Sequence, residues 1–131
     1  MARNQSQQPR SQRLRFGNAP RRGERILILK PRWLRQILNG TKTLEIRALN
    51  LRAGDVWLGC NKQVVAKALL GTGFHIRTEK MWRDLRSEHR VADNALPYKK
   101  TFALPVQVTQ RFADPIAYAH RRGAIGIVRF A

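Results

Sequence analysis

The sequence predicts an α+β domain in which a small, strongly bent mixed sheet or barrel carries two or three short helices. The chain has 131 residues, the length of a single domain, and at 43% hydrophobic it can bury a core. Strand-like patterns, with two-residue alternation or short apolar runs, outnumber helical patterns. A fold dominated by strands follows from this count.

The expected domain opens with a strand, a short helix and a glycine stop. Residues 25–30 are an apolar run bounded by cations, which suits a central strand buried on both faces. Pro31 is tolerated in the first turn of a helix, and apolar residues then repeat at helical spacing from Trp33 to Leu38. Asn39-Gly40 is a helix stop, because glycine readily takes the left-handed conformation there.

The rest of the chain is expected to add strands and a second helix. Met81, Trp82 and Leu85 form one apolar stripe of a helix that begins after Thr78 and ends near residue 90, and we interpret this stripe as core packing. A hairpin is expected around residues 61–63. The other expected elements are strands over residues 43–47, 56–60, 64–70, 74–77, 101–112 and 123–130, and a turn with a short helix over residues 113–122.

The charge of the chain is strongly one-sided. It has 26 basic and 8 acidic residues, a formal net charge of +18, which usually serves an anionic partner such as nucleic acid. Residues 1–25 are rich in Gln, Ser, Pro, Gly and Arg, and we expect a disordered basic arm there, with the domain spanning residues 26–131. The arm is expected either to lie on nucleic acid or to act as a targeting or solubilising leader.

Several classes of protein are disfavoured by what the sequence lacks. Cys60 is the only cysteine, so an internal disulfide is impossible, and the three histidines have no metal-ligand spacing. We therefore expect no metal and no cofactor. No long apolar run or secretory signal is present, so we expect no membrane partner and an intracellular location, cytoplasmic or nuclear (nucleoid), with organellar import left open.

The stretch GTKTLEIR, residues 40–47, places one of the few carboxylates among cations. Glu45 and Arg47 share the polar face of an alternating strand, and Lys42 lies at the strand entry, where the turn at Gly40 can bring it toward them. We expect Glu45 to orient both cations toward a ligand, with a purely structural ion pair as the alternative. In a catalytic interpretation Glu45 is a general base and Lys42 a protonated electrophilic stabiliser.

Other residues are candidate contacts to nucleic acid. Cations around the cleft mouth suit phosphate, and Trp33 and Trp57 adjoin the motif and can stack on bases, although both also suit the core. The candidate contacts are Lys30, Arg32, Trp33, Arg35, Lys42, Arg47, Arg52 and Trp57.

The stretch GTKTLEIR resembles the GxKxxExR motif of the ASCH domain family. The preceding strand and helix, the turn at residues 52–55 and the closing residues 122–126 resemble the family in the same order, so the resemblance spans roughly residues 26–130. It implies a PUA-like fold, a small β-barrel with helices around a basic cleft. In that superfamily the cleft is thought to take RNA or nucleotides.

The resemblance leaves three functions open. The first is RNA binding, favoured over DNA binding. The second is a hydrolase, either a ribonuclease or an amidohydrolase acting on N4-acetylcytidine, in which Lys42 fills the place of the family lysine. Glu45 stands where the threonine of that amidohydrolase branch would be, so its nucleophilic hydroxyl is missing. The third is a structural role in a ribonucleoprotein assembly.

Overall fold

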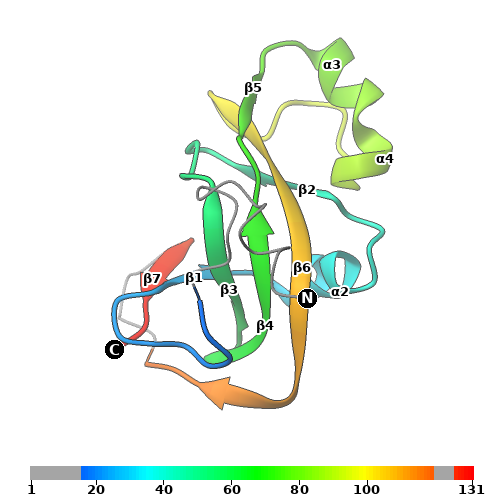
Figure 1. The fold of residues 1–131 in the computed structure, drawn as a ribbon. Helices are drawn as coiled ribbons and strands as arrows, with labels where there is room; N and C mark the ends of the chain where they lie inside the picture. The colour runs from blue at the N-terminus through cyan, green and yellow to red at the C-terminus, as the bar shows by residue number, and fades with distance from the viewer. Residues whose placement is uncertain (1–15, 120–125) are drawn as a thin grey trace, which may run out of the picture.

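The computed structural model describes residues 16–119 and 126–131 as a twisted sheet with three short helices (Figure 1). The strands are β1 (Arg25–Ile28), β2 (Leu44–Arg47), β3 (Gly54–Cys60), β4 (Gln63–Leu70), β5 (Phe74–Ile76), β6 (Thr101–Ala117) and β7 (Ile127–Arg129). The helices are α2 (Pro31–Leu38), α3 (Glu79–Asp84) and α4 (Arg86–His89).

The strands form one mixed sheet in the order β2-β6-β4-β3-β1-β7, with β5 also paired to β6. The β1–β3 pair is parallel, and the other pairs are antiparallel. In Figure 1 the long strand β6 runs along most of the molecule, and the sheet curls around it. The predicted α+β class, with a bent mixed sheet and short helices, is confirmed.

The main core lies between the sheet and helix α2. Leu34 and Ile37, one turn apart on α2, are buried against strand residues that include Leu27, Leu58 and Leu104. Pro31 starts the helix, and the backbone N–H of Asn39 bonds back to the Arg35 carbonyl at its end. Because this apolar face is fixed on the sheet, the helix start is held beside the end of β1, where the candidate site lies.

Residues 16–24, here called the strap, lie against the opposite side of the core. The Phe16 ring stacks on Trp57 with centroids 5.1 Å apart, and the Phe16 N–H donates to Asp55 Oδ2 at 3.0 Å. Lys67 Nζ donates to the carbonyl of Gly17 at 2.9 Å. Residues 1–15 of the expected basic arm lie outside the described residues, whereas the rest of that segment packs on the domain.

Helices α3 and α4 form a small lobe at one end of the sheet (Figure 1). Thr78 caps α3, since its Oγ1 accepts from the Met81 N–H at 3.1 Å. Trp82 is 0% exposed and stacks on His89 with centroids 3.7 Å apart. The expected core role of the Met81–Trp82 stripe is confirmed, although the single expected helix is divided into two short ones.

The turn and short helix expected over residues 113–122 were a wrong prediction for the part of that segment that is described. Strand β6 continues to Ala117, which pairs with Gln63 of β4. Between the pairs Val64–Ile116 and Ala66–Arg111 the register shifts, so the residues between Arg111 and Ile116 form a bulge within the strand in place of the expected turn. Residues 120–122, and residues 123–125 of the expected last strand, lie outside the described residues.

None of the helices formed by the described residues combines the length and the apolar composition needed to cross a membrane.

The strap contact predicts a measurable loss of stability. Phe16→Ala removes the ring stacked on Trp57, and because Phe16 is only partly buried we expect the free energy of unfolding to fall by about 1–3 kcal/mol. Urea denaturation measures the change. Leu49→Ala is the control, since Leu49 is 70% exposed and its loss should shift stability by less than about 0.5 kcal/mol. Equal stability of both variants and the parent would show that the strap contributes nothing to the fold.

Candidate functional site: a basic cleft over strand β2

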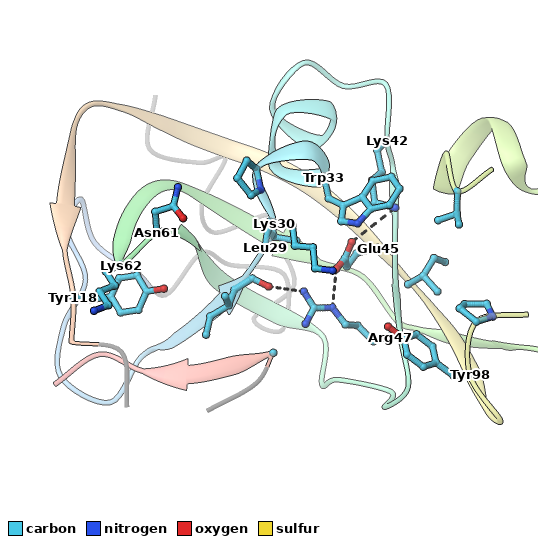
Figure 2. Close-up of a pocket in the computed structure, with 16 residues that line it drawn as sticks. Leu29, Lys30, Trp33, Lys42, Glu45, Arg47, Asn61, Lys62, Tyr98 and Tyr118 are labelled. Carbon is cyan, nitrogen blue, oxygen red and sulfur yellow. Dashed lines mark hydrogen bonds and ion pairs between the residues drawn. The ribbon is translucent and has the colours of Figure 1, made fainter. Parts of the chain in front are cut away.

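A cleft of about 690 Å³ lies between the end of β1, the start of α2 and strand β2. Figure 2 shows Tyr118 and Lys62 at one end of the cleft and Tyr98 at the other, with Arg47 between them. Among the lining residues described, four are cations and one is a carboxylate. They are Lys30, Lys42, Arg47, Lys62 and Glu45.

Glu45 contacts two of these cations at once. Its Oε2 accepts from Arg47 Nε at 2.7 Å, and its Oε1 lies 3.8 Å from Lys42 Nζ. The residue is 4% exposed, and its backbone is paired in the sheet with Leu104 of β6. The expectation that the turn at Gly40 brings Lys42 to the Glu45–Arg47 pair is confirmed by these distances.

Arg47 also joins two strands that are not neighbours in the sheet. Its Nη2 donates to the Ile28 carbonyl at the end of β1, at 2.8 Å (Figure 2). Gly126 lies alongside with φ +84°, and a Cβ built there would be 3.1 Å from Arg47 Nη1. A side chain at position 126 would therefore be strained and would also crowd the guanidinium. Glycine at this position leaves the cleft floor open around Arg47.

Lys42 is enclosed, and this changes its acid–base behaviour. Its side chain is 1% exposed, its Nζ donates to the His89 carbonyl, and the same nitrogen lies 4.6 Å from the Trp33 ring centroid. Burial lowers the pKa of Lys42 to about 8, against the attraction of Glu45 that raises it. The sequence-based expectation of a protonated lysine therefore holds at neutral pH but with a much smaller margin. Lys42 is better placed to hold the site together than to meet a phosphate in solvent.

His89 supplies the carbonyl that Lys42 needs, and its ring is fixed in turn. Nδ1 accepts from the Val91 N–H at 2.9 Å, so the proton lies on Nε2, which donates to the Trp82 carbonyl at 2.7 Å. Burial lowers the pKa of the His89 ring, which favours the same neutral form. No pattern in the sequence singled out His89, because its partners are backbone atoms of a lobe distant in sequence from Lys42.

Lys30 and Lys62 are the accessible cations of the cleft. Both are exposed, and no described carboxylate lies within ion-pair distance of either. Lys62 occupies the second position of the two-residue turn between β3 and β4, with φ 63°, after Asn61 with φ 51°. Left-handed backbone at both positions is typical of the tight turn that matches strand twist. The predicted hairpin is thus confirmed, and it presents a lysine to the cleft.

Of the remaining predicted contacts, Trp33 lines the cleft. The others do not, and they are Arg32, Arg35, Arg52 and Trp57. Arg32 is exposed and sits 4.4 Å from the centroid of the Trp33 ring, which itself lines the cleft. Arg35 is exposed on α2. Arg52 is also exposed, and its backbone carbonyl accepts a hydrogen bond from Arg25 Nη1 at 2.8 Å. Trp57 is 0% exposed under Phe16, so it is a core residue and has no face free for a base.

Sequence reasoning missed two aromatic residues of the cleft, Tyr98 and Tyr118. Tyr118 follows β6 and is 7% exposed, and its backbone N–H donates to the Lys62 carbonyl at 3.0 Å. Tyr98 precedes Lys99 and Lys100, and an aromatic beside two lysines was a usable signal in the sequence. In the described part of the chain no group of three or more His, Cys, Asp or Glu side chains is placed to hold a metal ion.

Comparison with solved structures places this architecture beside the ASCH protein of Zymomonas mobilis. A serine-to-alanine variant of that protein matches with a TM-score of 0.66 and 20% identity, over 86% of this chain and 92% of the other. A tyrosine-to-phenylalanine variant matches with 0.64 and 19%, over 84% and 91%. The unmodified protein matches with 0.63 and 17%, over 85% and 90%. Neither a protein-family model nor a curated protein matches the chain.

The class of protein is therefore set by fold: the chain is an α+β protein whose curled mixed sheet with short helices is similar in fold to an ASCH protein. The resemblance drawn from GTKTLEIR is confirmed at that level. Among solved structures the chain is similar to the Zymomonas mobilis ASCH protein, and at 17–20% identity this likeness shows the fold alone. The function has to be inferred from the residues of the cleft.

The enclosure of Lys42 predicts an unusual titration. With its pKa lowered to about 8 from 10.5, the unfolded chain binds more protons than the folded protein between these values. The contribution of Lys42 to the free energy of unfolding therefore rises with pH across that window and is lowest below it. Carbon-13 NMR of the lysine Cε resonances should show one signal with a midpoint near pH 8 that is absent in Lys42→Met.

The same pair of proteins tests the sign. The stability of the parent minus that of Lys42→Met should increase between about pH 8 and 10.5 in urea denaturation. A constant difference, together with a Lys42 resonance that titrates with the surface lysines, would mean that the ammonium group is solvated.

Proposed function

We propose that the protein binds RNA, with one nucleotide unit held in the cleft. The observation that supports this is the charge arrangement: four cations line the cleft, and the one carboxylate among its described lining residues is already engaged by two of them. Lys30 and Lys62 are left to meet an anion from outside. A polyanion therefore complements this cleft better than a neutral or cationic ligand.

The size and the walls of the cleft suit a nucleotide. About 690 Å³ falls within the range of small-ligand sites, which is roughly 300–1,000 Å³. Trp33 offers aromatic surface for a base, and Arg47 offers a planar fork whose position is fixed by Glu45 and the Ile28 carbonyl. RNA is favoured over DNA because its bases are more often unpaired and available to a pocket.

The N-terminal residues would extend the electrostatic contact. Residues 1–15 contain four arginines and no acidic residue. Because the strap is packed on the domain at Phe16, these arginines are tethered to a fixed point and would add sequence-independent affinity for phosphates. The same properties suit a component of a ribonucleoprotein assembly, which we propose as the wider setting.

A second candidate function is hydrolysis, and the acid–base state of Lys42 favours it. An amine with a pKa of about 8 beside a carboxylate in a cleft is suited to proton transfer near neutral pH. Against hydrolysis, a substrate has little access to Lys42 and Glu45, because both side chains are nearly fully buried. Among the described residues, the position three after Lys42 is occupied by Glu45 rather than by a hydroxyl nucleophile.

RNA binding predicts a graded effect of the two accessible lysines. Lys30→Gln and Lys62→Asn each remove one cation, and asparagine tolerates the left-handed backbone at position 62. For a short fluorescein-labelled single-stranded RNA, each variant should lower the slope of log K against log salt by about 0.7. Fluorescence anisotropy over a salt series measures it.

Lys80→Gln is the matched control, because Lys80 is an exposed lysine on α3 that is paired with Asp84 at 2.7 Å. Loss of affinity that is equal in all three variants would indicate a diffuse charge effect without a role for the cleft. Deleting residues 2–15 tests the arm by the same slope, and an unchanged slope would remove the arm from the proposal.

The variant Glu45→Gln distinguishes RNA binding from hydrolysis. Glu45→Gln keeps the size of the side chain but leaves Lys42 and Arg47 without a counter-charge, so stability should fall by a few kcal/mol whichever function holds. An enzyme would lose turnover of RNA or of N4-acetylcytidine by at least about 100-fold while the folded variant still binds. Product analysis by chromatography reports turnover. Lack of turnover by the parent protein would leave binding as the function.

A further inference from the structure

Tyr98 is an exposed aromatic side chain at the end of the cleft. It is 43% exposed, and among the described residues only Leu49 is a large hydrophobic side chain that is more exposed. Figure 2 shows its ring at the opposite end of the cleft from Tyr118, with the hydroxyl directed toward Arg47. A single exposed aromatic side chain is ordinary, but this one lies at the opening of a cationic cleft, where its exposed part is accessible to a ligand.

The backbone that carries Tyr98 is fixed. The Tyr98 N–H donates to Thr101 Oγ1 at 3.3 Å, and the Thr101 hydroxyl donates back to the Tyr98 carbonyl at 3.1 Å. Thr101 is 1% exposed and begins β6, where it pairs with Ile76. The backbone of Tyr98 is thus held by a closed turn at the start of β6, and a partner that covers the ring needs to order only two side-chain torsions.

The two residues after Tyr98 are cations without a described acidic partner. Lys99 and Lys100 are exposed, and neither takes part in an ion pair within residues 16–119 and 126–131, which hold all eight acidic residues of the chain. The nearest acid in sequence, Asp93, has its Oδ1 bonded to the Ala95 N–H at 3.0 Å. An aromatic face beside two available cations matches a base with its flanking phosphates.

We propose that the turn at residues 98–100 is a second nucleotide site, in which an unpaired base stacks on Tyr98 and the flanking phosphates meet Lys99 and Lys100. This inference rests on the proposed function and narrows its ligand to a single-stranded segment of at least two nucleotides. A duplex would not serve, because its bases are stacked on one another and offer no face to the ring. A free mononucleotide in the cleft has no second phosphate to place against Lys99 and Lys100, which lie outside the cleft lining.

The test compares ligands of different length on the full chain. Uridine 5′-monophosphate, a short single-stranded RNA and a blunt-ended duplex of two complementary RNA strands are titrated against the parent, Tyr98→Ala and Tyr98→Phe. Tyr98→Ala should weaken the single strand by about 5- to 150-fold and should weaken uridine 5′-monophosphate by a smaller factor, because the mononucleotide offers no second base to the ring. Tyr98→Phe keeps the ring and should bind as the parent does. Leu49→Ala controls for loss of an exposed apolar side chain.

The outcomes distinguish this inference from the function on which it rests. If Lys30→Gln and Lys62→Asn weaken the single strand but Tyr98→Ala does not, the cleft binds RNA and the second site is wrong. If the blunt-ended duplex binds as tightly as the single strand, stacking on Tyr98 is also wrong. If the parent binds none of the three ligands, both proposals fall. An equal loss of affinity in Tyr98→Phe and Tyr98→Ala would assign the effect to the hydroxyl and contradict base stacking on the ring.

Lys99→Gln and Lys100→Gln supply an independent readout. Each should lower the salt slope for the single-stranded RNA by about 0.7 and leave the affinity for uridine 5′-monophosphate unchanged. An unchanged slope in both variants would show that no phosphate contacts Lys99 or Lys100.

Discussion

The buried carboxylate of Glu45 is the interaction on which the site depends. Its oxygens lie 2.7 Å from Arg47 Nε and 3.8 Å from Lys42 Nζ, and each of these two cations also contacts a different part of the molecule. Arg47 reaches the end of β1 through the Ile28 carbonyl, and Lys42 reaches the α3–α4 lobe through the His89 carbonyl. One anion therefore ties together three segments that sheet hydrogen bonds do not connect. Removing one member of such a buried group typically costs about 3–5 kcal/mol, because the others lose their compensation.

The cations of the cleft divide into two kinds with different physical roles. Lys42 and Arg47 are committed to protein partners and define the shape of the cleft. Lys30 and Lys62 have no carboxylate near them in the described residues and add to the self-repulsion of a chain with net charge +18. A ligand that brings negative charge relieves that repulsion, whereas a neutral ligand does not. This difference favours a polyanion independently of any resemblance to other proteins.

The parts of the fold that local sequence determines were predictable. The alternation in residues 43–47 predicts strand β2, and the spacing from Pro31 to Leu38 predicts helix α2. The proximity of Lys42 to Glu45 follows from a short turn. The prediction made the long strand β6 too short, because the last residues of that strand are held by pairing with β4, a contact distant in sequence. Trp57 was misplaced for the same kind of reason, since the cover over its ring comes from Phe16, 41 residues away in sequence. His89 and Tyr98 reach the site through tertiary contacts that no periodicity records.

The hairpin turn at Asn61-Lys62 has a consequence for how the protein can be modified. Lys62 holds a left-handed backbone, which glycine adopts with less strain, at a position that faces the cleft. Redesign for heat resistance from backbone geometry alone would place glycine there and would delete a cation from the ligand site. Selection for thermal tolerance and selection for ligand affinity would thus drive this residue in opposite directions.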